Sequence, residues 1–297
     1  MHEPEQLVIR PPSEARSLLV RLTRGCDWNR CLFCGIYDLY GTPYSTRTAG
    51  EVKLDIDALA ERHSGWFKTA FLGDANPLNM PAEDLVEILR HLKKKFPTIG
   101  RVTAYGRASS IWKKTDEELK AIRDAGLDRL HIGMESGSDE VLRLQKKGTS
   151  SKQLIETGQR ARAAGFEVSF YLLLGLGGQA LSKEHVLGSV RVINEARPDF
   201  VRVRRLWVHP ASRLNNMIET GKFKEQTPEG TVIELRDILY GINADCIHFT
   251  CDHANNYIQI HGELMKDKAG MLGFIDNFLK LPESERKRHY ASMPSVI

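Results

Sequence analysis

Hydrophobic and polar positions recur along the chain with two periods, that of a strand and that of a helix. Short apolar runs with strand period predict six β-strands, at residues 17–23, 67–74, 101–107, 129–135, 167–175 and 200–208. Apolar residues at helical spacing predict helices at 52–63, 82–95, 116–125, 139–145, 151–164 and 183–196. Strands that alternate with helices of this length require crossover connections, so the pattern predicts an α/β fold with a parallel sheet.

One face is polar or small and the other apolar in five of the six predicted strands, all but the strand at 67–74. The polar set comprises Arg21, Thr23, Arg101, Thr103, Tyr105, Arg107, His131, Gly133, Glu135, Glu167, Ser169, Tyr171, Arg202 and Arg204. An open sheet with helices on both sides would need two apolar faces. Six strand–helix units with a polar concave face predict a partial (β/α)6 TIM-like barrel, open on one side, whose interior binds a polar ligand. The alternative is that these positions are solvent-exposed strand ends.

Several short motifs follow the carboxyl ends of the predicted strands. A cysteine-rich loop follows the first strand, Gly73-Asp74-Ala75-Asn76 follows the second, and Glu135-Ser136-Gly137 ends the fourth. Gly175-Leu176-Gly177-Gly178 ends the fifth strand. Ligands of parallel α/β sheets bind at the carboxyl ends of the strands, so we expect these motifs to belong to one site.

Composition is that of an ordinary globular protein of 297 residues, with 41% hydrophobic and 27% charged residues. The net charge of +4 is too small to indicate nucleic-acid binding by itself. The polar start of the chain lacks the apolar core of a signal peptide, and no stretch approaches the roughly 18 apolar residues of a membrane span. With its cysteines clustered rather than spread for disulfides, we expect a cytoplasmic protein without a membrane partner.

Three of the five cysteines, Cys26, Cys31 and Cys34, lie within nine residues with the spacing C-x4-C-x2-C. A loop this short can bring three thiolates to one metal centre. A structural zinc site takes four ligands, so either a fourth ligand comes from elsewhere or the site keeps an open position. A 4Fe–4S cluster held by three thiolates would leave one iron open to another ligand.

Taken in order and on these elements, the motifs resemble the radical SAM superfamily over residues 17–208. The chain is most similar to the branch that includes methylthiotransferases, the elongator catalytic subunit and oxygen-independent coproporphyrinogen oxidases. The resemblance implies that Cys26, Cys31 and Cys34 bind a 4Fe–4S cluster, and that the open iron binds the amino and carboxylate groups of S-adenosylmethionine (SAM). The commonest family spacing is C-x3-C-x2-C, so the extra residue before Cys31 is a departure that concerns loop geometry.

The resemblance further implies which residues contact SAM. These are Phe33 and Gly175 near the adenine, Gly73, Asp74 and Ala75 at the amino group, Glu135 and Ser136 at the ribose and methionine, and Arg107 and Arg162 at the carboxylate. A surface ion pair is the alternative for Arg107, and a solvated helix face is the alternative for Arg162. For Asp74, whose carboxylate is shorter than the family's glutamate, backbone carbonyls of the motif are the alternative ligand.

The implied activity is reductive cleavage of SAM to a 5′-deoxyadenosyl radical that abstracts hydrogen from an unidentified substrate. Such an enzyme needs an external electron donor of the flavodoxin or ferredoxin type. If Arg202 and Arg204 point inward, they and the nearby Arg205 and His209 favour a small anionic substrate. An exposed basic edge is the alternative for these residues. Modification of RNA or of a peptide is the alternative, and a non-catalytic metal-binding module is the rival from another class.

Residues 210–297 are expected to form an extension that caps the open side of a core domain spanning residues 1–209. We predict helices at 232–244 and 267–279 in this extension. Between them lie Cys246, His248, Cys251 and His253, which could bind a second metal. The favoured alternative is a strand that covers the open side of the barrel, because two cysteines four apart lack the pattern of an auxiliary cluster domain.

Overall fold

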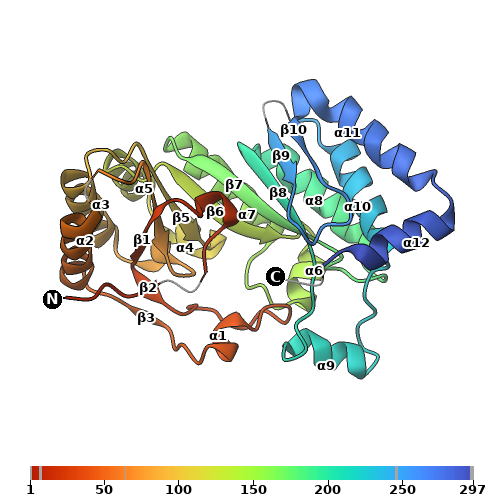
Figure 1. The fold of residues 1–297 in the computed structure, drawn as a ribbon, viewed down its shortest axis with the longest axis horizontal. Helices are drawn as coiled ribbons and strands as arrows, with labels where there is room; N and C mark the ends of the chain where they lie inside the picture. The colour runs from red at the N-terminus through yellow and green to blue at the C-terminus, as the bar shows by residue number, and fades with distance from the viewer. Residues whose placement is uncertain (1, 7–8, 64, 245–246, 295–297) are drawn as a thin grey trace. The chain divides into compact units, whose positions relative to one another are not determined.

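The computed structural model describes residues 2–6, 9–63, 65–244 and 247–294 (Figure 1). These residues form two compact units. The first unit comprises Met1–Asn29, Ile36–Ile132 and Arg160–Val168. The second comprises Arg30–Gly35, Gly133–Gln159 and Ser169–Ile297. Among the described residues, no helix is both long and apolar enough to cross a membrane.

The first unit is built on parallel strands that pair in chain order: β1 (Leu18–Arg21), β4 (Thr69–Gly73), β5 (Arg101–Gly106) and the first half of β6 (Arg129–Glu135). Its helices are α1 (Ile36–Leu39), α2 (Ala49–His63), α3 (Ala82–Lys95), α4 (Ala108–Lys113) and α5 (Asp116–Asp124), with 3-10 turns η1 (Pro12–Glu14) and η2 (Pro77–Asn79). A separate antiparallel pair, β2 (Thr23–Arg24) and β3 (Ser45–Thr46), flanks the cysteine loop in the sequence. Helix α3 packs against both α2 and α5.

The second unit contains β7 (Glu167–Leu174), β8 (Phe200–Arg205), β9 (His248–Cys251) and β10 (Ile260–Glu263). Strands β7, β8 and β9 pair in parallel, and β10 pairs antiparallel with β9. Its helices are α6 (Asp139–Leu144), most of α7 (Ser151–Ala163), α8 (Ser182–Ala196), α9 (Arg213–Glu219), α10 (Pro228–Gly241), α11 (Leu264–Leu279) and α12 (Glu283–Ser292). Helix α10 packs between α8 and α11 (Figure 1).

Local sequence accounts for where the helices begin and which faces they bury. In α5 the Thr115 side chain accepts a hydrogen bond from the Glu118 amide, and the Glu118 carboxylate accepts one from the Thr115 amide. In α3 the buried residues recur at helical spacing, namely Leu85, Ile88, Leu89 and Leu92. These apolar stripes seat the helices on the apolar faces of the strands, which leaves the opposite strand faces for polar residues.

The polar face predicted for the strands is present, and in the first unit it is packed rather than hollow. Glu14 enters from η1 and is fully buried, where it accepts a hydrogen bond from Ser17 at 2.6 Å and lies 3.4 Å from the ring nitrogen of His131. Burial raises the pKa of Glu14, but the hydrogen bonds from His131 and Ser17 outweigh it and leave the pKa below its usual value. The rings of Phe71 and Tyr105 pack edge to face on the same side.

The six predicted strands correspond to β1, β4, β5, β6, β7 and β8. Five are shorter than predicted, and only β6 has its predicted bounds. Strand β1 ends at Arg21, because Thr23 pairs with β3, and β8 ends at Arg205. The helix predicted at 232–244 is α10, which begins four residues earlier because Thr227 caps it and Pro228 occupies its first position. The sequence analysis did not predict α4, α9, α12 or β10.

The predicted division at residue 209 stays a prediction. The described part of the proposed extension belongs to the second unit, together with β7 and β8.

Candidate active site

The first half of the cysteine loop begins with a glycine that no other residue could replace without strain. Gly25 has φ +66°, and a Cβ there would lie 2.7 Å from the Thr42 carbonyl oxygen. The sulfur of Cys26, which follows, accepts a hydrogen bond from the Asn29 amide at 3.5 Å. Amide hydrogen bonds of this kind stabilise thiolates that bind iron–sulfur clusters.

Three hydrogen-bonded residues, Asp27, Asn76 and Arg107, attach this half of the loop to the segments that follow β4 and β5. The Asp27 carboxylate accepts from Asn76 Nδ2 and from Arg107 Nη1, both at 3.0 Å. Asn76 is fully buried, and its Oδ1 accepts from the Arg107 amide at 3.0 Å. The Arg107 guanidinium lies 5.0 Å from the centre of the Trp28 ring.

Arg107 forms a half-buried ion pair with Asp27, which fits the alternative of an ion pair for this residue. Its pairing with the SAM carboxylate stays a prediction. The roles of Asp27 and Trp28 were not predicted, although both residues lie between the first two cysteines.

The second half of the loop is held in the second unit by its backbone and by one apolar side chain. The Leu32 amide donates to the Gln145 carbonyl at 3.0 Å, and the Leu32 carbonyl accepts from the Leu214 amide at 2.9 Å. The Leu32 side chain is buried against Leu214 and Phe223, with Phe33 packed beside this group. Helix α9 and the segment after it therefore support the loop that carries Cys31 and Cys34.

Asp74, predicted at the amino group of SAM, is fully buried and its carboxylate is already satisfied. Oδ2 accepts from Arg21 at 2.8 Å, and Oδ1 accepts from the Tyr37 hydroxyl at 2.6 Å. The Asp74 amide donates to the Thr23 carbonyl at 3.2 Å. This arrangement favours the alternative in which backbone carbonyls of residues 73–75 serve as ligands, while the Asp74 side chain joins β4 to β1 and α1.

Glu135, Lys147 and Phe33 come together in the second unit. Glu135 has φ +61°, and its carboxylate pairs with Lys147 at 3.0 Å, where both side chains are largely buried. The Lys147 ammonium lies 5.9 Å from the centre of the Phe33 ring. A non-glycine residue in the left-handed region is uncommon and recurs at functional sites. Two residues predicted at SAM are thus neighbours through Lys147, which the sequence analysis did not identify.

Ser136 and Gly175 occupy tightly packed positions. Ser136 is buried, and its hydroxyl pairs with His185 Nδ1 at 2.8 Å while accepting from the Ser138 amide at 3.1 Å. Burial lowers the pKa of His185, so the imidazole is neutral. Gly175 has φ +80°, and its amide donates to the buried Glu234 carboxylate at 2.7 Å. Both residues therefore have structural partners; their assignment to SAM stays a prediction.

Arg162 is exposed in the last turn of α7. Exposure fits the alternative of a solvated helix face, and its pairing with the SAM carboxylate also stays a prediction.

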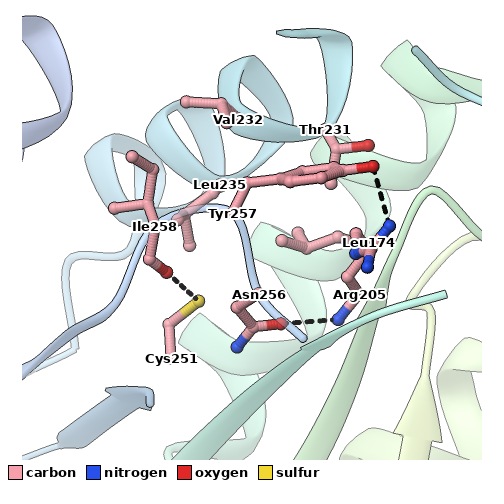
Figure 2. Close-up of a pocket in the computed structure, with 9 residues that line it drawn as sticks. All are labelled: Leu174, Arg205, Thr231, Val232, Leu235, Cys251, Asn256, Tyr257 and Ile258. Atoms are coloured by element: carbon pink, nitrogen blue, oxygen red, sulfur yellow. Dashed lines mark hydrogen bonds between the residues drawn. The ribbon is translucent and has the colours of Figure 1, made fainter. Parts of the chain in front are cut away.

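The cluster of cysteines and histidines near the C-terminus separates into unrelated contacts. Cys251 is fully buried in β9, where its thiol donates to the Ile258 carbonyl at 3.3 Å, and burial raises its pKa far above the usual value (Figure 2). The His248 ring stacks on Phe200, and His253 pairs with Asn255 at 2.6 Å. Cys246 lies outside the described residues. Within the described residues, His248–Cys251 of this segment form strand β9, and a second metal site stays a prediction.

The three loop cysteines have the donor chemistry that a 4Fe–4S cluster requires. Each is half-buried, and none forms a disulfide. In the part of the chain that the structure describes, no three His, Cys, Asp or Glu side chains are arranged to hold a metal ion. The fit therefore rests on the donor set, which is three cysteines within nine residues that form no disulfide. One of them accepts an amide hydrogen bond, and separate elements support the loop on either side.

The chain belongs to the radical SAM superfamily, whose family model matches residues 20–188, more than half of its length. Members of this superfamily are enzymes that bind a 4Fe–4S cluster and SAM. Membership confirms the predicted family, the α/β fold class and the two cofactors, and it argues against a non-catalytic metal-binding module.

Individual relatives are distant. The chain is 23% identical over 215 residues to the heme chaperone HemW of Bacillus subtilis, covering 72% of this chain and 54% of the relative. It is 27% identical over 234 residues to a tRNA-2-methylthio-N(6)-dimethylallyladenosine synthase of Syntrophobacter fumaroxidans, covering 76% of this chain and 48% of the relative. The chain thus spans about half the length of these relatives.

Among solved structures, the chain resembles coproporphyrinogen III oxidase (HemN) of Escherichia coli, described as a radical SAM enzyme. The TM-score is 0.55 at 19% identity, over 76% of this chain and 52% of that one. At this identity the likeness supports the fold alone.

Proposed function

We propose that this enzyme uses its cofactors for hydrogen abstraction from a small anionic substrate. When bound, the cluster and SAM supply reductive cleavage of a carbon–sulfur bond, which gives methionine and a 5′-deoxyadenosyl radical that takes a hydrogen atom from the substrate. The electron comes from an external donor of the flavodoxin or ferredoxin type. Superfamily membership, together with three loop cysteines that form no disulfide, is the observation that carries this proposal.

The chain's own residues then have defined tasks. Cys26, Cys31 and Cys34 hold the cluster, and the contacts of Asp27 and Leu32 fix the two halves of the loop that presents them. The backbone at Gly73 and Ala75 receives the amino group of SAM. Free thiols are maintained in a reducing compartment, so we expect the enzyme to work in the cytoplasm.

Residues around Glu135 have the remaining tasks toward SAM. The Glu135 carboxylate, oriented by Lys147, accepts hydrogen bonds from ribose hydroxyls, and the Phe33 backbone lies by the adenine.

The test is anaerobic reconstitution of the chain with iron and sulfide, followed by reduction in the presence of SAM. We expect absorbance near 400 nm, about four irons per chain, and 5′-deoxyadenosine in the product mixture. Cys31→Ala should abolish all three signals. Cys251→Ala is the matched control, because this cysteine is buried outside the loop and should leave them intact. Wild-type protein that binds no cluster and forms no 5′-deoxyadenosine would contradict the proposal.

A second candidate, modification of RNA, is favoured by the name of the Syntrophobacter fumaroxidans relative, a tRNA-modifying enzyme. Affinity for tRNA that falls steeply with salt concentration would support it. Affinity that is weak and independent of salt would favour a small substrate.

A further inference from the structure

The polar face of the second unit carries two arginines without a counter-charge. Arg202 and Arg204 alternate along β8 with Val201 and Val203, and both valines are buried. Because side chains alternate along a strand, the two arginines share the opposite face, where both are half-buried. In the described part of the chain, neither guanidinium forms an ion pair with a carboxylate.

Other inner arginines of this protein do have carboxylate partners. Arg21 pairs with Asp74 at 2.8 Å, and Arg107 pairs with Asp27 at 3.0 Å. A charge taken partly out of water costs free energy unless a partner compensates it. The two arginines of β8 therefore differ from those of the first unit in lacking this compensation.

Their neighbour Arg205, on the same strand, has a structural role because its guanidinium is hydrogen-bonded within the protein. It lies on the opposite face of β8, where its Nε donates to the Asn255 carbonyl at 2.7 Å. Its Nη1 donates to the Tyr257 hydroxyl, also at 2.7 Å (Figure 2). Its guanidinium also stacks on the Tyr257 ring at 4.2 Å. Arg205 therefore holds the segment after β9 in place, whereas the described structure shows no such hydrogen bonds from Arg202 or Arg204 to a loop of the chain.

Residues of β7 hold the two arginines in position. Arg202 Nε donates to the hydroxyl of the fully buried Ser169 at 3.2 Å. The Arg204 guanidinium lies 5.6 Å from the centre of the Tyr171 ring. Each contact orients a side chain while leaving terminal guanidinium nitrogens as hydrogen-bond donors, which is the arrangement that a planar oxyanion requires.

A third group on this face also lacks a partner. Thr250 of β9 lies opposite Arg202 in the strand register, so the two side chains point to the same side. Its hydroxyl oxygen is buried and has no hydrogen-bond partner in the described structure. Buried hydroxyls without a partner are rare in folded proteins, so this oxygen independently indicates a ligand beside Arg202.

We infer that Arg202, Arg204 and the Thr250 hydroxyl bind an anionic group of the substrate, either a carboxylate or a phosphate. This inference rests on the proposed function, because it places the substrate of that reaction on this face. Two residues on one strand stand roughly 7 Å apart, which suits one or two anionic groups of a small molecule. An RNA backbone is instead followed by a long exposed basic stripe.

The test measures binding of inorganic phosphate and of succinate to the reconstituted full chain, through NMR signals of the arginine side chains. We expect both probes, or one of them, to bind the wild-type protein. The variant R202Q/R204Q should bind about tenfold more weakly or worse. The matched control K183Q/K222Q loses the same two charges at exposed positions of the second unit and should bind as the wild type does.

The probes distinguish the two anions, because binding of only one of them assigns the site to a phosphate or to a carboxylate. Absence of binding, or an equal loss in the control, would overturn the inference. So would a single-stranded RNA that binds more tightly than either probe and loses affinity equally in both double variants.

Thr250→Val separates ligand binding from structure. Because the hydroxyl has no partner in the free protein, its removal should weaken anion binding without lowering the thermal unfolding temperature. A lower unfolding temperature with unchanged binding would overturn the role of Thr250.

This test does not depend on SAM cleavage. Failure to bind anions in a protein that forms 5′-deoxyadenosine would overturn only the anion site. Anion binding without 5′-deoxyadenosine would overturn only the proposed function.

Discussion

The ion pair between Asp27 and Arg107 offers the sharpest test of how the cysteine loop is positioned. Asp27→Ala removes the carboxylate that accepts from Arg107 and from Asn76. Arg107 would then lose the carboxylate with which it forms its ion pair. Asn76 would keep Ser110 as a partner at 2.8 Å. The main cost is therefore the loss of this ion pair by a largely buried guanidinium.

The size of this cost follows from burial. Each of the two side chains is only 14% exposed. Breaking a buried pair costs about 3–5 kcal/mol, whereas an exposed pair contributes about 0–1 kcal/mol. With slight exposure on both sides, we expect Asp27→Ala to lower the free energy of unfolding by about 2–4 kcal/mol.

The assay is urea denaturation of Asp27→Ala, Arg107→Met and the double variant. The double-mutant cycle should give a coupling energy of about 1–3 kcal/mol, because the second change removes the charge that the first leaves unpaired. Asp124→Ala is the matched control: Asp124 pairs with Lys120, but both side chains are 59% exposed, and we expect a change within about 0.5 kcal/mol. Equal effects of Asp27→Ala and Asp124→Ala, with no coupling, would refute the reasoning.

Three further predictions concern other groups. Leu32→Ala, at a side chain that is 6% exposed, should lower the free energy of unfolding by about 2–4 kcal/mol in urea denaturation and reduce the iron retained after reconstitution. Cys251 should resist iodoacetamide at pH 8 in the native protein, because burial raises the pKa of its thiol, whereas mass spectrometry should find Cys26 alkylated in cluster-free protein. Burial chiefly, and also the charge of Arg204, lower the pKa of His253. Arg204→Gln should therefore raise the pKa of His253 in an NMR titration. An unchanged pKa would show that the Arg204 charge does not act on His253.

The strands and helices were predictable because their signals are local. The helical spacing of the apolar residues identified α3. The alternation of Arg202 and Arg204 with two valines indicated which face of β8 is polar. Partners of individual side chains are not local. Asp74 is paired with Arg21, 53 residues away, and Asp27 with Arg107, 80 residues away. No periodicity encodes such pairings, which is why the sequence did not predict that the Asp74 carboxylate accepts hydrogen bonds from Arg21 and Tyr37.

The extra residue between Cys26 and Cys31 falls between two fixed points of the loop. Before it, Asp27 and Trp28 are held by Arg107; after it, Leu32 is held by backbone hydrogen bonds. Between them Asn29 adopts φ +40°, a region that asparagine tolerates better than most residues.

In this conformation Asn29 forms two hydrogen bonds. Its amide donates to the Cys26 sulfur at 3.5 Å, and its side chain donates to Asp38 at 2.6 Å. The left-handed turn at Asn29 lies within the longer spacing, between the attachment of Asp27 and that of Leu32. Because the Asn29 amide donates to the Cys26 sulfur, this turn forms part of the environment of the first cysteine.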